Sequence, residues 1–226
     1  MNNVGHLHPL SVFFDQSMAF FEELGFVVAQ GQELETEWFN FDFLRVPSDH
    51  PSRDQQDTFW VGDHVLRTHT TSAQGRIMQK VSPPCRFVMP GRVFRNEATD
   101  ATHESVLHQL DGFAIAKNIT MSHLIGTLET FIKNVIDKNA NVRFRPHHYQ
   151  FVEPGMDVDI NRNGKWLEVI GSGMIHPEVL KNMRLNPDKW QGFAFGMGVE
   201  RLAMIKYGIK DIRSFLKNDM RLIKQF

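Results

Sequence analysis

The chain has 226 residues, enough to bury one substantial hydrophobic core. Its 42% hydrophobic and 23% charged residues are typical of a globular protein and exclude the disordered and fibrous classes. Lys and Arg number 25 against 26 Asp and Glu, which excludes the overall positive charge that attracts nucleic acid non-specifically. Any contact with nucleic acid must therefore be local or supplied by a partner.

The single cysteine, Cys85, excludes an intramolecular disulfide and is interpreted as a small core residue, as expected in the reducing cytoplasm. Residues 1–9 carry neither the basic cap nor the apolar stretch of a signal peptide. No apolar run approaches the roughly 20 residues that a membrane-spanning helix needs. We therefore expect a cytoplasmic protein without a membrane segment.

The N-terminal part of the chain predicts a helix followed by a functional loop. Residues 11–24 place Phe and Leu side chains at helical spacing, and Gly25 follows where a helix C-cap glycine belongs. Residues 26–29 predict a short apolar strand. The aromatic-rich segment 38–44 leads into the polar residues 47–57, where we expect a flexible, functional connection.

Strands dominate the middle of the chain. Residues 58–61 and 65–68 flank a Gly-Asp pair typical of a tight hairpin, and a short helix is expected over residues 72–79. Longer helices are predicted over residues 122–138 and 199–207. Further strands are predicted at residues 86–95, 107–116, 141–144, 156–160 and 165–170.

Several of these strands follow one another without an intervening helix, which favours an antiparallel over a parallel sheet. The predicted fold class is therefore α+β, with a mixed, mainly antiparallel sheet flanked by helices. We expect residues 1–226 to form a single domain.

Polar side chains gather in residues 91–112, which predict two strands and their connecting loop. Because alternate residues of a strand share a face, Arg95 lies with Glu97 and Gln109 lies with Asp111. One face then carries a fixed cation, carboxylates and an amide, which suits a zwitterionic substrate held against a phosphate. The alternative is a hairpin with a solvated, salt-bridged outer face, which charged strand residues usually form.

A second polar position, Glu168, lies on an otherwise apolar strand run. Burying a carboxylate is costly unless it is paired or binds a metal. The nearby Gly171 and Gly173 allow the backbone to approach a ligand closely. An outward-facing Glu on a half-exposed strand, followed by turn glycines, is the alternative.

The glycine-rich residues 192–198 run directly into the helix that carries Arg201 in its first turn. A cation is electrostatically unfavourable at a helix N-terminus unless an anion is bound nearby, so this arrangement is typical of a phosphate site. The glycines alone are not specific evidence, because they also allow close strand–helix packing. A surface arginine paired with Glu200 or another acid is the alternative.

Eleven histidines raise the question of a metal site, but no pair has the HExxH or Cys/His spacing of zinc sites. The signatures of the P-loop and of the nucleophile elbow are also absent from the sequence. We therefore expect no His-ligated structural metal.

Together, these segments resemble motifs 2 and 3 of class II aminoacyl-tRNA synthetases, and in detail the phenylalanyl-tRNA synthetase α-subunit family. The resemblance covers nearly all of residues 5–226. The matching strings are DHPSRDQQDTF (49–59), LRTHT (66–70), PGRVFRNEATDATHE (90–104), HQLDG (108–112), RFRP (143–146), FVEPG (151–155), GSGMIHP (171–177), GFAFGMGVERLAMIKYGIKDIRSF (192–215) and NDMRLIKQF (218–226).

The resemblance implies the class II fold and two reactions. Phenylalanine and ATP would form phenylalanyl-adenylate, and the acyl group would then move to the terminal adenosine of tRNA. Mg²⁺ is the implied metal, with Glu168 as its ligand. The implied catalytic cations are Arg95 and Arg201, and the implied ATP-binding residues are Arg95, Glu97, His103, Leu107 and Arg201, where Leu107 replaces the aromatic residue that stacks on adenine.

By the same resemblance, Asp111 and Gln109 would bind the substrate ammonium, aromatic residues would contact the substrate ring, and Ala194 would limit the depth of the pocket. The implied amino-acid-binding residues are His69, Thr71, Gln109, Asp111, Tyr149, Phe151, Gly173 and Ala194. The family usually has Ser, Glu, Phe and Pro where this chain has Thr71, Asp111, Tyr149 and Gln150, so the amino-acid specificity stays open.

The family works as a dimer or with a β subunit as a heterotetramer, and both partners are implied here. Gln32 stands where the family's motif 1 proline belongs at the dimer interface, so the oligomeric state stays open. The matching region implies neither the N-terminal coiled-coil arm nor a C-terminal anticodon-binding domain. Two other functions also stay open: a free-standing paralogue that delivers the adenylate to an acceptor other than tRNA, and a non-catalytic amino-acid- or nucleotide-binding module.

Overall fold

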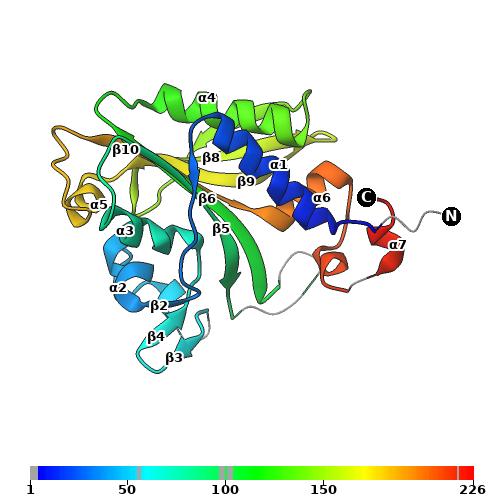
Figure 1. The fold of residues 1–226 in the computed structure, drawn as a ribbon, viewed down its shortest axis with the longest axis horizontal. Helices are drawn as coiled ribbons and strands as arrows, with labels where there is room; N and C mark the ends of the chain where they lie inside the picture. Colours follow the sequence, from blue (N-terminus) through cyan, green and yellow to red (C-terminus); the bar gives the residue numbers. More distant parts are fainter. Residues whose placement is uncertain (1–4, 55–56, 97–99, 101–103, 218) are drawn as a thin grey trace.

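A seven-stranded sheet forms the centre of the part of the chain that the computed structural model describes, which is residues 5–54, 57–96, 100, 104–217 and 219–226 (Figure 1). The order of its strands is β1-β5-β6-β10-β9-β8-β7. Only β1 and β5 are parallel neighbours; the other pairs are antiparallel. The strands are β1 (Val27–Val28), β5 (Cys85–Phe94), β6 (Val106–Ala116), β7 (Val142–Pro146), β8 (Val152–Arg162), β9 (Lys165–Ile175) and β10 (Gln191–Gly198).

This sheet confirms the predicted α+β class and the mainly antiparallel arrangement. The pairing of β5 with β6 sets which side chains share a face, with Met89 opposite Asp111 and Gly91 opposite Gln109. Asp111 and Gln109 therefore project from one face of β6, while Leu110 between them enters the core on the other face.

Helices α1 (Pro9–Glu23), α4 (Met121–Phe131) and α6 (Val199–Tyr207) cover one face of the sheet (Figure 1). Their apolar sides and the strands enclose the larger of two hydrophobic cores. At its centre the ring of Phe21 stacks between Phe131 and Phe195, with centroid distances of 5.0 and 5.1 Å. Aromatic packing of this kind fixes α1 against both the sheet and α4.

The other face carries α2 (Glu37–Asn40), α3 (Ala73–Met78), α5 (Pro177–Asn182) and the second, smaller core. These short helices cover that face incompletely and leave room for a cavity beside β6 and β8–β10. A three-stranded sheet of order β2-β4-β3 extends from them, with β2 (Leu34–Thr36), β3 (Trp60–Val61) and β4 (His64–Leu66). The remaining short elements are η1 (Asp42–Leu44), η2 (Pro51–Arg53), η3 (Thr70–Ser72), η4 (Ile132–Ile136), η5 (Ile212–Phe215) and α7 (Met220–Ile223).

The predicted elements are present with shifted ends. The helix predicted at residues 199–207 is α6 with the same bounds, and Gly208 closes it at φ 71°. The helix predicted at 122–138 is α4 followed by the π-turn η4. Helix α5 was not predicted; it begins at a proline and is capped by the His176 ring, which accepts from the Glu178 amide.

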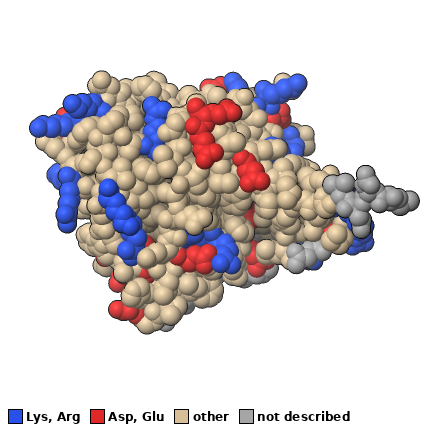
Figure 2. Space-filling view, viewed as in Figure 1, with Lys and Arg blue, Asp and Glu red and all other residues tan. Residues whose placement is uncertain are grey.

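The surface agrees with the near-neutral composition. On the face seen in Figure 2, basic and acidic side chains are scattered with uncharged surface between them. None of the described helices is both long and apolar enough to cross a membrane.

Candidate active site

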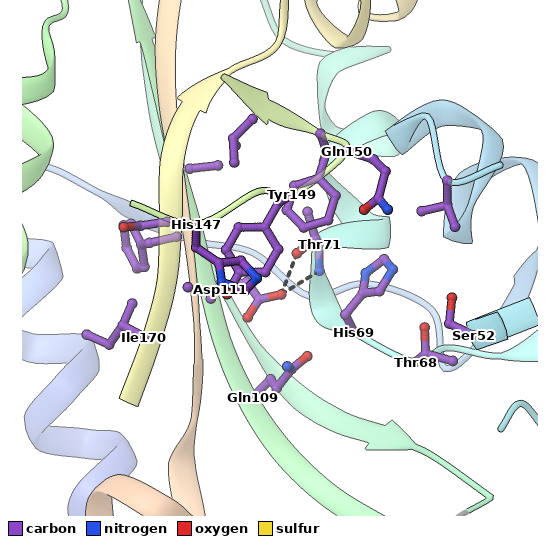
Figure 3. Close-up of a pocket in the computed structure, with 18 of the residues that line it drawn as sticks. Ser52, Thr68, His69, Thr71, Gln109, Asp111, His147, Tyr149, Gln150 and Ile170 are labelled. Carbon is purple, nitrogen blue, oxygen red and sulfur yellow. Dashed lines mark hydrogen bonds between the residues drawn. The ribbon is translucent and has the colours of Figure 1, made fainter. Parts of the chain in front are cut away.

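A cavity of about 690 Å³ opens on the less covered face of the sheet, a size typical of small-molecule sites. Side chains from β6, β8, β9 and β10 form one wall, and residues before α3 and β8 form the others (Figure 3). The sequence-predicted residues that line this cavity are His69, Thr71, Arg95, Gln109, Asp111, Tyr149, Phe151, Glu168, Ala194 and Arg201.

Two arginines from distant parts of the chain, Arg95 and Arg201, line this one cavity. Arg95 directly follows β5, and its Nε lies 3.4 Å from the carbonyl oxygen of Thr68. Arg201 is in the first turn of α6 and is exposed. A pair of separate guanidinium groups facing the same space suits a ligand with several anionic groups.

Arg201 is not paired with Glu200, so that part of the alternative is wrong. Glu200 is buried and accepts from the amide and the Nδ1 of His108 at 3.0 and 2.6 Å. This contact ties the first turn of α6 to β6. Within the described residues Arg201 itself has no ion-pair partner, which leaves its charge available to a ligand at the helix N-terminus.

Asp111 is a buried carboxylate at the floor of the cavity, 1% exposed. Its Oδ2 accepts from the amide of Thr71 at 2.8 Å and from the Thr71 hydroxyl at 2.5 Å (Figure 3). Its Oδ1 has no hydrogen-bond partner among the described residues. Burial raises the pKa of Asp111, although the Thr71 and Thr70 hydroxyls, the Thr71 amide and the charge of Arg95 oppose this. An incoming ammonium would supply the missing partner.

Glycine at position 196 makes room for this carboxylate. A Cβ built on Gly196 would lie 2.8 Å from Oδ1 of Asp111, closer than real Cβ atoms approach other atoms. The missing side chain of Gly196 therefore lets the backbone of β10 lie close to the Asp111 carboxylate. This role of the glycine does not depend on contact with a phosphate.

His69 is held neutral by burial and by the nearby charges of Arg95 and Arg67. Its Nε2 lies 2.9 Å from the carbonyl oxygen of Asn40, which can only accept, so the proton is on Nε2. Burial, and then the charge of Arg95, lower the pKa of His69 to about 4. Its Nδ1 is consequently an acceptor, and it has no partner in the described part of the chain.

The aromatic rings of His147, Tyr149 and Phe151, which precede β8, line another part of the cavity. The rings of Tyr149 and Phe151 stack with centroids 5.6 Å apart, and the His147 ring lies 4.6 Å from that of Tyr149. The hydroxyl of Tyr149 donates to Oδ1 of Asp157 at 2.6 Å. Stacked aromatic rings and a buried carboxylate in one cavity suit an amino acid with a large apolar side chain.

Glu168 faces the cavity from β9 with half of its side chain exposed, and it lies 3.4 Å from Nη2 of Arg145. No cluster of three or more His, Cys, Asp or Glu placed to hold a metal exists among the described residues. Mg²⁺ usually takes one or two protein carboxylates and completes its shell with water and substrate phosphates. The accessible carboxylate of Glu168, outside any such cluster of described residues, therefore fits a metal ion that arrives with a nucleotide.

Comparison with known proteins connects this geometry to a family. The family described as tRNA synthetases class II core domain (F) matches residues 1–226. The chain is 48% identical over 224 residues to the phenylalanine–tRNA ligase alpha subunit of Klebsiella pneumoniae (strain 342), which covers 98% of this chain and 68% of that protein. The chain belongs to the class II aminoacyl-tRNA synthetases. This confirms the family and the ligase class that the sequence motifs predicted.

Other proteins of this class are also similar to the chain, in sequence or in fold. The phenylalanine–tRNA ligase alpha subunit of Shigella flexneri is 47% identical over 224 residues, again 98% of this chain and 68% of its own length. Among solved structures, the pyrrolysyl-tRNA synthetase of Desulfitobacterium hafniense superposes with a TM-score of 0.70 at 18% identity, over 92% of this chain and 73% of that one. At 18% identity this similarity shows the fold alone, and the chain therefore has the class II synthetase fold.

Two of the described residues predicted for the site, Leu107 and Gly173, are not among those lining the cavity. Leu107 is half-buried and packs against the larger core. Gly173 is buried against β8, where an added Cβ would lie 2.6 Å from the carbonyl oxygen of Pro154. Glu97 and His103 lie outside the described residues.

Asn40, which does not line the cavity but supports residues that do, was not singled out from the sequence. Asn40 anchors both His69 and Thr68, and its amide Nδ2 donates to the Thr68 hydroxyl at 3.1 Å. It lies in the aromatic-rich segment and carries no pattern that would have indicated a site. By contrast, His50, Ser52 and Asp57 lie in or next to the loop 47–57 where a functional connection was expected.

Proposed function

We propose that this chain activates phenylalanine with ATP to form phenylalanyl-adenylate and transfers the acyl group to tRNA(Phe). The observation that carries the proposal is the meeting of Arg95, Arg201 and the buried Asp111 in one cavity. An adenylate-forming site must hold an ammonium at one end and neutralise a carboxylate and a triphosphate at the other. The 48% identity to a phenylalanine–tRNA ligase alpha subunit supports phenylalanine as the substrate.

The amino acid would bind with its ammonium at Oδ1 of Asp111 and at the amide of Gln109. Its ring would enter between the aromatic wall of Tyr149 and Phe151 and the side chain of Ala194, which is 8% exposed at the back of the cavity. An ammonium at Oδ1 gives this buried carboxylate the partner that it lacks, so binding also relieves a desolvation penalty.

Adenylation needs no general base, because the substrate carboxylate is ionised at neutral pH. One of its oxygens attacks the α-phosphorus of ATP, and the bond from that phosphorus to the pyrophosphate oxygen breaks. Arg95 would hold the substrate carboxylate and the α-phosphate together, and Arg201 would stabilise the distal phosphates and the adenine face. In the second step a ribose hydroxyl of tRNA attacks the acyl carbon, and AMP leaves.

Mg²⁺ would bind through Glu168 and, when bound, supply charge neutralisation on the phosphates. The proposal includes a cytoplasmic location, to which the single cysteine gives support, and a phenylalanyl-tRNA synthetase β subunit as partner. Gln32 is exposed between β1 and β2, as a residue at a subunit interface would be in an isolated chain.

The test is ATP–pyrophosphate exchange with each of the twenty amino acids, measured for the chain alone and with a β subunit. We expect exchange that depends on phenylalanine, and acylation of tRNA(Phe) by the same preparation. Exchange with no amino acid under either condition contradicts the proposal. Exchange without tRNA acylation would instead support delivery of the adenylate to another acceptor.

A further inference from the structure

A buried carboxylate joins the first turn of α6 to strand β6. Glu200 is 3% exposed, and its two oxygens accept from the backbone amide of His108 at 3.1 and 3.0 Å. Its Oε1 also accepts from Nδ1 of His108 at 2.6 Å, which places a proton on that nitrogen. His108 therefore supplies, from its backbone and from its ring, the hydrogen bonds that a buried carboxylate requires.

This contact lies where the pairing of β6 with β10 ends. Gln109 opposite Gly198 is the last pair, and the chain then turns into α6 at Val199. The amide of His108 consequently has no strand partner on that side, and a backbone amide shielded from water needs an acceptor. Glu200 takes the place of the missing strand carbonyl, so the start of α6 is held at a fixed position along β6.

The ring of His108 has a second contact, with helix α1. It meets the ring of Phe14 edge-on, with centroids 5.7 Å apart and an interplanar angle of 75°. Edge-to-face packing of this kind restricts the orientation of both rings. The imidazole is thus held by Glu200 and by Phe14, and its Nδ1 stays directed at the carboxylate.

The two cationic residues of the cavity are both attached to the start of β6. The amide of Arg95 donates to the carbonyl oxygen of Ser105 at 3.0 Å, and Arg201 directly follows Glu200 on α6. The side chain of Arg201 has no hydrogen bond or ion pair with a described residue, so the first turn of α6 determines where its guanidinium group can reach. The separation of the two guanidinium groups is therefore set along the short stretch of chain 105–108.

We propose that His108 and Glu200 are positioning residues, whose hydrogen bonds hold Arg201 at the distance from Arg95 that a bound triphosphate requires. The inference rests on the proposed function, since it takes the two arginines as the cations that bind ATP. Neither His108 nor Glu200 lines the cavity, so both act through Arg201 and not by touching the nucleotide. A misplacement of about 1 Å can cost about 10²-fold in rate, so the loss of one hydrogen bond at this anchor has a measurable effect.

The first test separates the ring of His108 from its donor. His108→Phe keeps a ring against Phe14 and removes Nδ1, whereas His108→Asn places an amide donor near the position of Nδ1. In pyrophosphate exchange we expect the KM for ATP to rise about tenfold in His108→Phe, while the KM for phenylalanine changes by less than about twofold. His108→Asn should restore most of the affinity for ATP. An unchanged KM for ATP in His108→Phe, or an equal rise for both substrates, overturns the proposal.

His64→Phe is the matched control. Nδ1 of His64 lies 2.6 Å from Oδ1 of Asp63, a contact like that of His108 with Glu200, but His64 is outside the cavity lining and this contact is exposed. Both KM values should stay unchanged in His64→Phe. Urea melts identify conditions in which all variants are folded. A rise of the KM for ATP in the folded control equal to that in His108→Phe overturns the proposal.

A double-mutant cycle tests whether His108 acts through Arg201. When Arg201 is already Ala, His108→Phe should change kcat/KM for ATP by less than about twofold, because the group that it positions is absent. Additive losses in the double variant overturn the proposal. If His108→Phe does not fold, Glu200→Gln takes its place in the same cycle, since it keeps the side-chain volume and one acceptor. Additive losses there overturn the proposal in the same way.

Calorimetric binding of ATP with Mg²⁺ to the unaltered chain and to the His108 variants separates this inference from the proposed function. Weaker binding by His108→Phe, with no exchange by any of the proteins, supports the positioning role and contradicts only adenylation. Exchange by the unaltered chain, with the same ATP affinity in His108→Phe, overturns the inference and leaves the proposed function in place. The absence of ATP binding by the unaltered chain overturns both.

Discussion

At the scale of single residues, the cavity combines groups that the fold satisfies with groups that it leaves for a ligand. Asp111 shows both, because Thr71 takes Oδ2 while Oδ1 has no partner among the described residues. Arg201 likewise lacks an ion-pair partner there, although its neighbour Glu200 is fully engaged with His108. Unsatisfied buried or clustered charge is costly, so its presence at one cavity indicates a site for a charged ligand.

Replacing Arg201 with Ala should lower kcat/KM for adenylation by about 10²–10³-fold, because one fixed cation facing the developing charge is removed. Pyrophosphate exchange at saturating phenylalanine and varied ATP measures this. Arg221→Ala is the matched control, since Arg221 is almost fully exposed on α7 and pairs only with Asp219 among the described residues. If both variants lose activity equally, Arg201 has no special role.

His69 should make stability depend on pH. Its pKa is about 4 in the fold against 6.5 in the unfolded chain, so below pH 6.5 the unfolded state binds a proton that the folded state does not. The free energy of unfolding should therefore decrease by about 2 kcal/mol on this account between pH 7.5 and pH 5.0. Urea melts of the unaltered chain and of His69→Gln measure it; the variant should lose that part of the dependence. The same dependence in both proteins would exclude His69 as its source.

At the scale of elements, the site depends on close contact between β6 and β10. Gly196 pairs with Asp111, and its missing side chain accommodates the carboxylate. In the same way Gly112 leaves space for the ring of Phe195, where an added Cβ would come within 2.4 Å of the ring. The glycine-rich string was predicted as part of a site, but its pairing with the strand of Asp111 is a property of the sheet order that no local pattern specifies.

Gly196→Ala should destabilise the fold by about 1–3 kcal/mol and reduce amino-acid binding, because the new methyl group displaces Asp111. Gly126→Ala is the matched control. Gly126 lies within α4, and an added Cβ there meets nothing within 4 Å, so helix propensity predicts a gain of up to about 1 kcal/mol. Thermal melts and calorimetry with phenylalanine measure both effects. Destabilisation of similar size in the two variants would contradict the role assigned to Gly196.

At the scale of the whole molecule, the sequence predicts helices, strands and motifs better than it predicts the residues that hold the cavity side chains in place. Helix α6, the β5–β6 hairpin and the two arginines follow from periodicity and from long matching strings. Asn40 and Asp157 do not follow from such patterns. Asn40 acts through contacts with Thr68 and His69, which are distant in the chain. Asp157 acts through contacts with Tyr149 and with Arg145 on the neighbouring strand. Such contacts arise only when the sheet and its covering helices are assembled.

The two faces of the sheet have separate tasks, since the larger core lies under α1, α4 and α6 while the cavity opens on the opposite face. Phe21→Ala should lower the free energy of unfolding by about 3–5 kcal/mol, because its ring is fully buried between Phe131 and Phe195. At a temperature where the variant is folded, its KM for phenylalanine should equal that of the unaltered chain. Denaturant melts and exchange kinetics measure both quantities, with Phe226→Ala at the partly exposed chain end as the control expected to cost much less. A raised KM in folded Phe21→Ala would mean that the α1 face also sets the geometry of the cavity, and the separation of the two faces would be wrong.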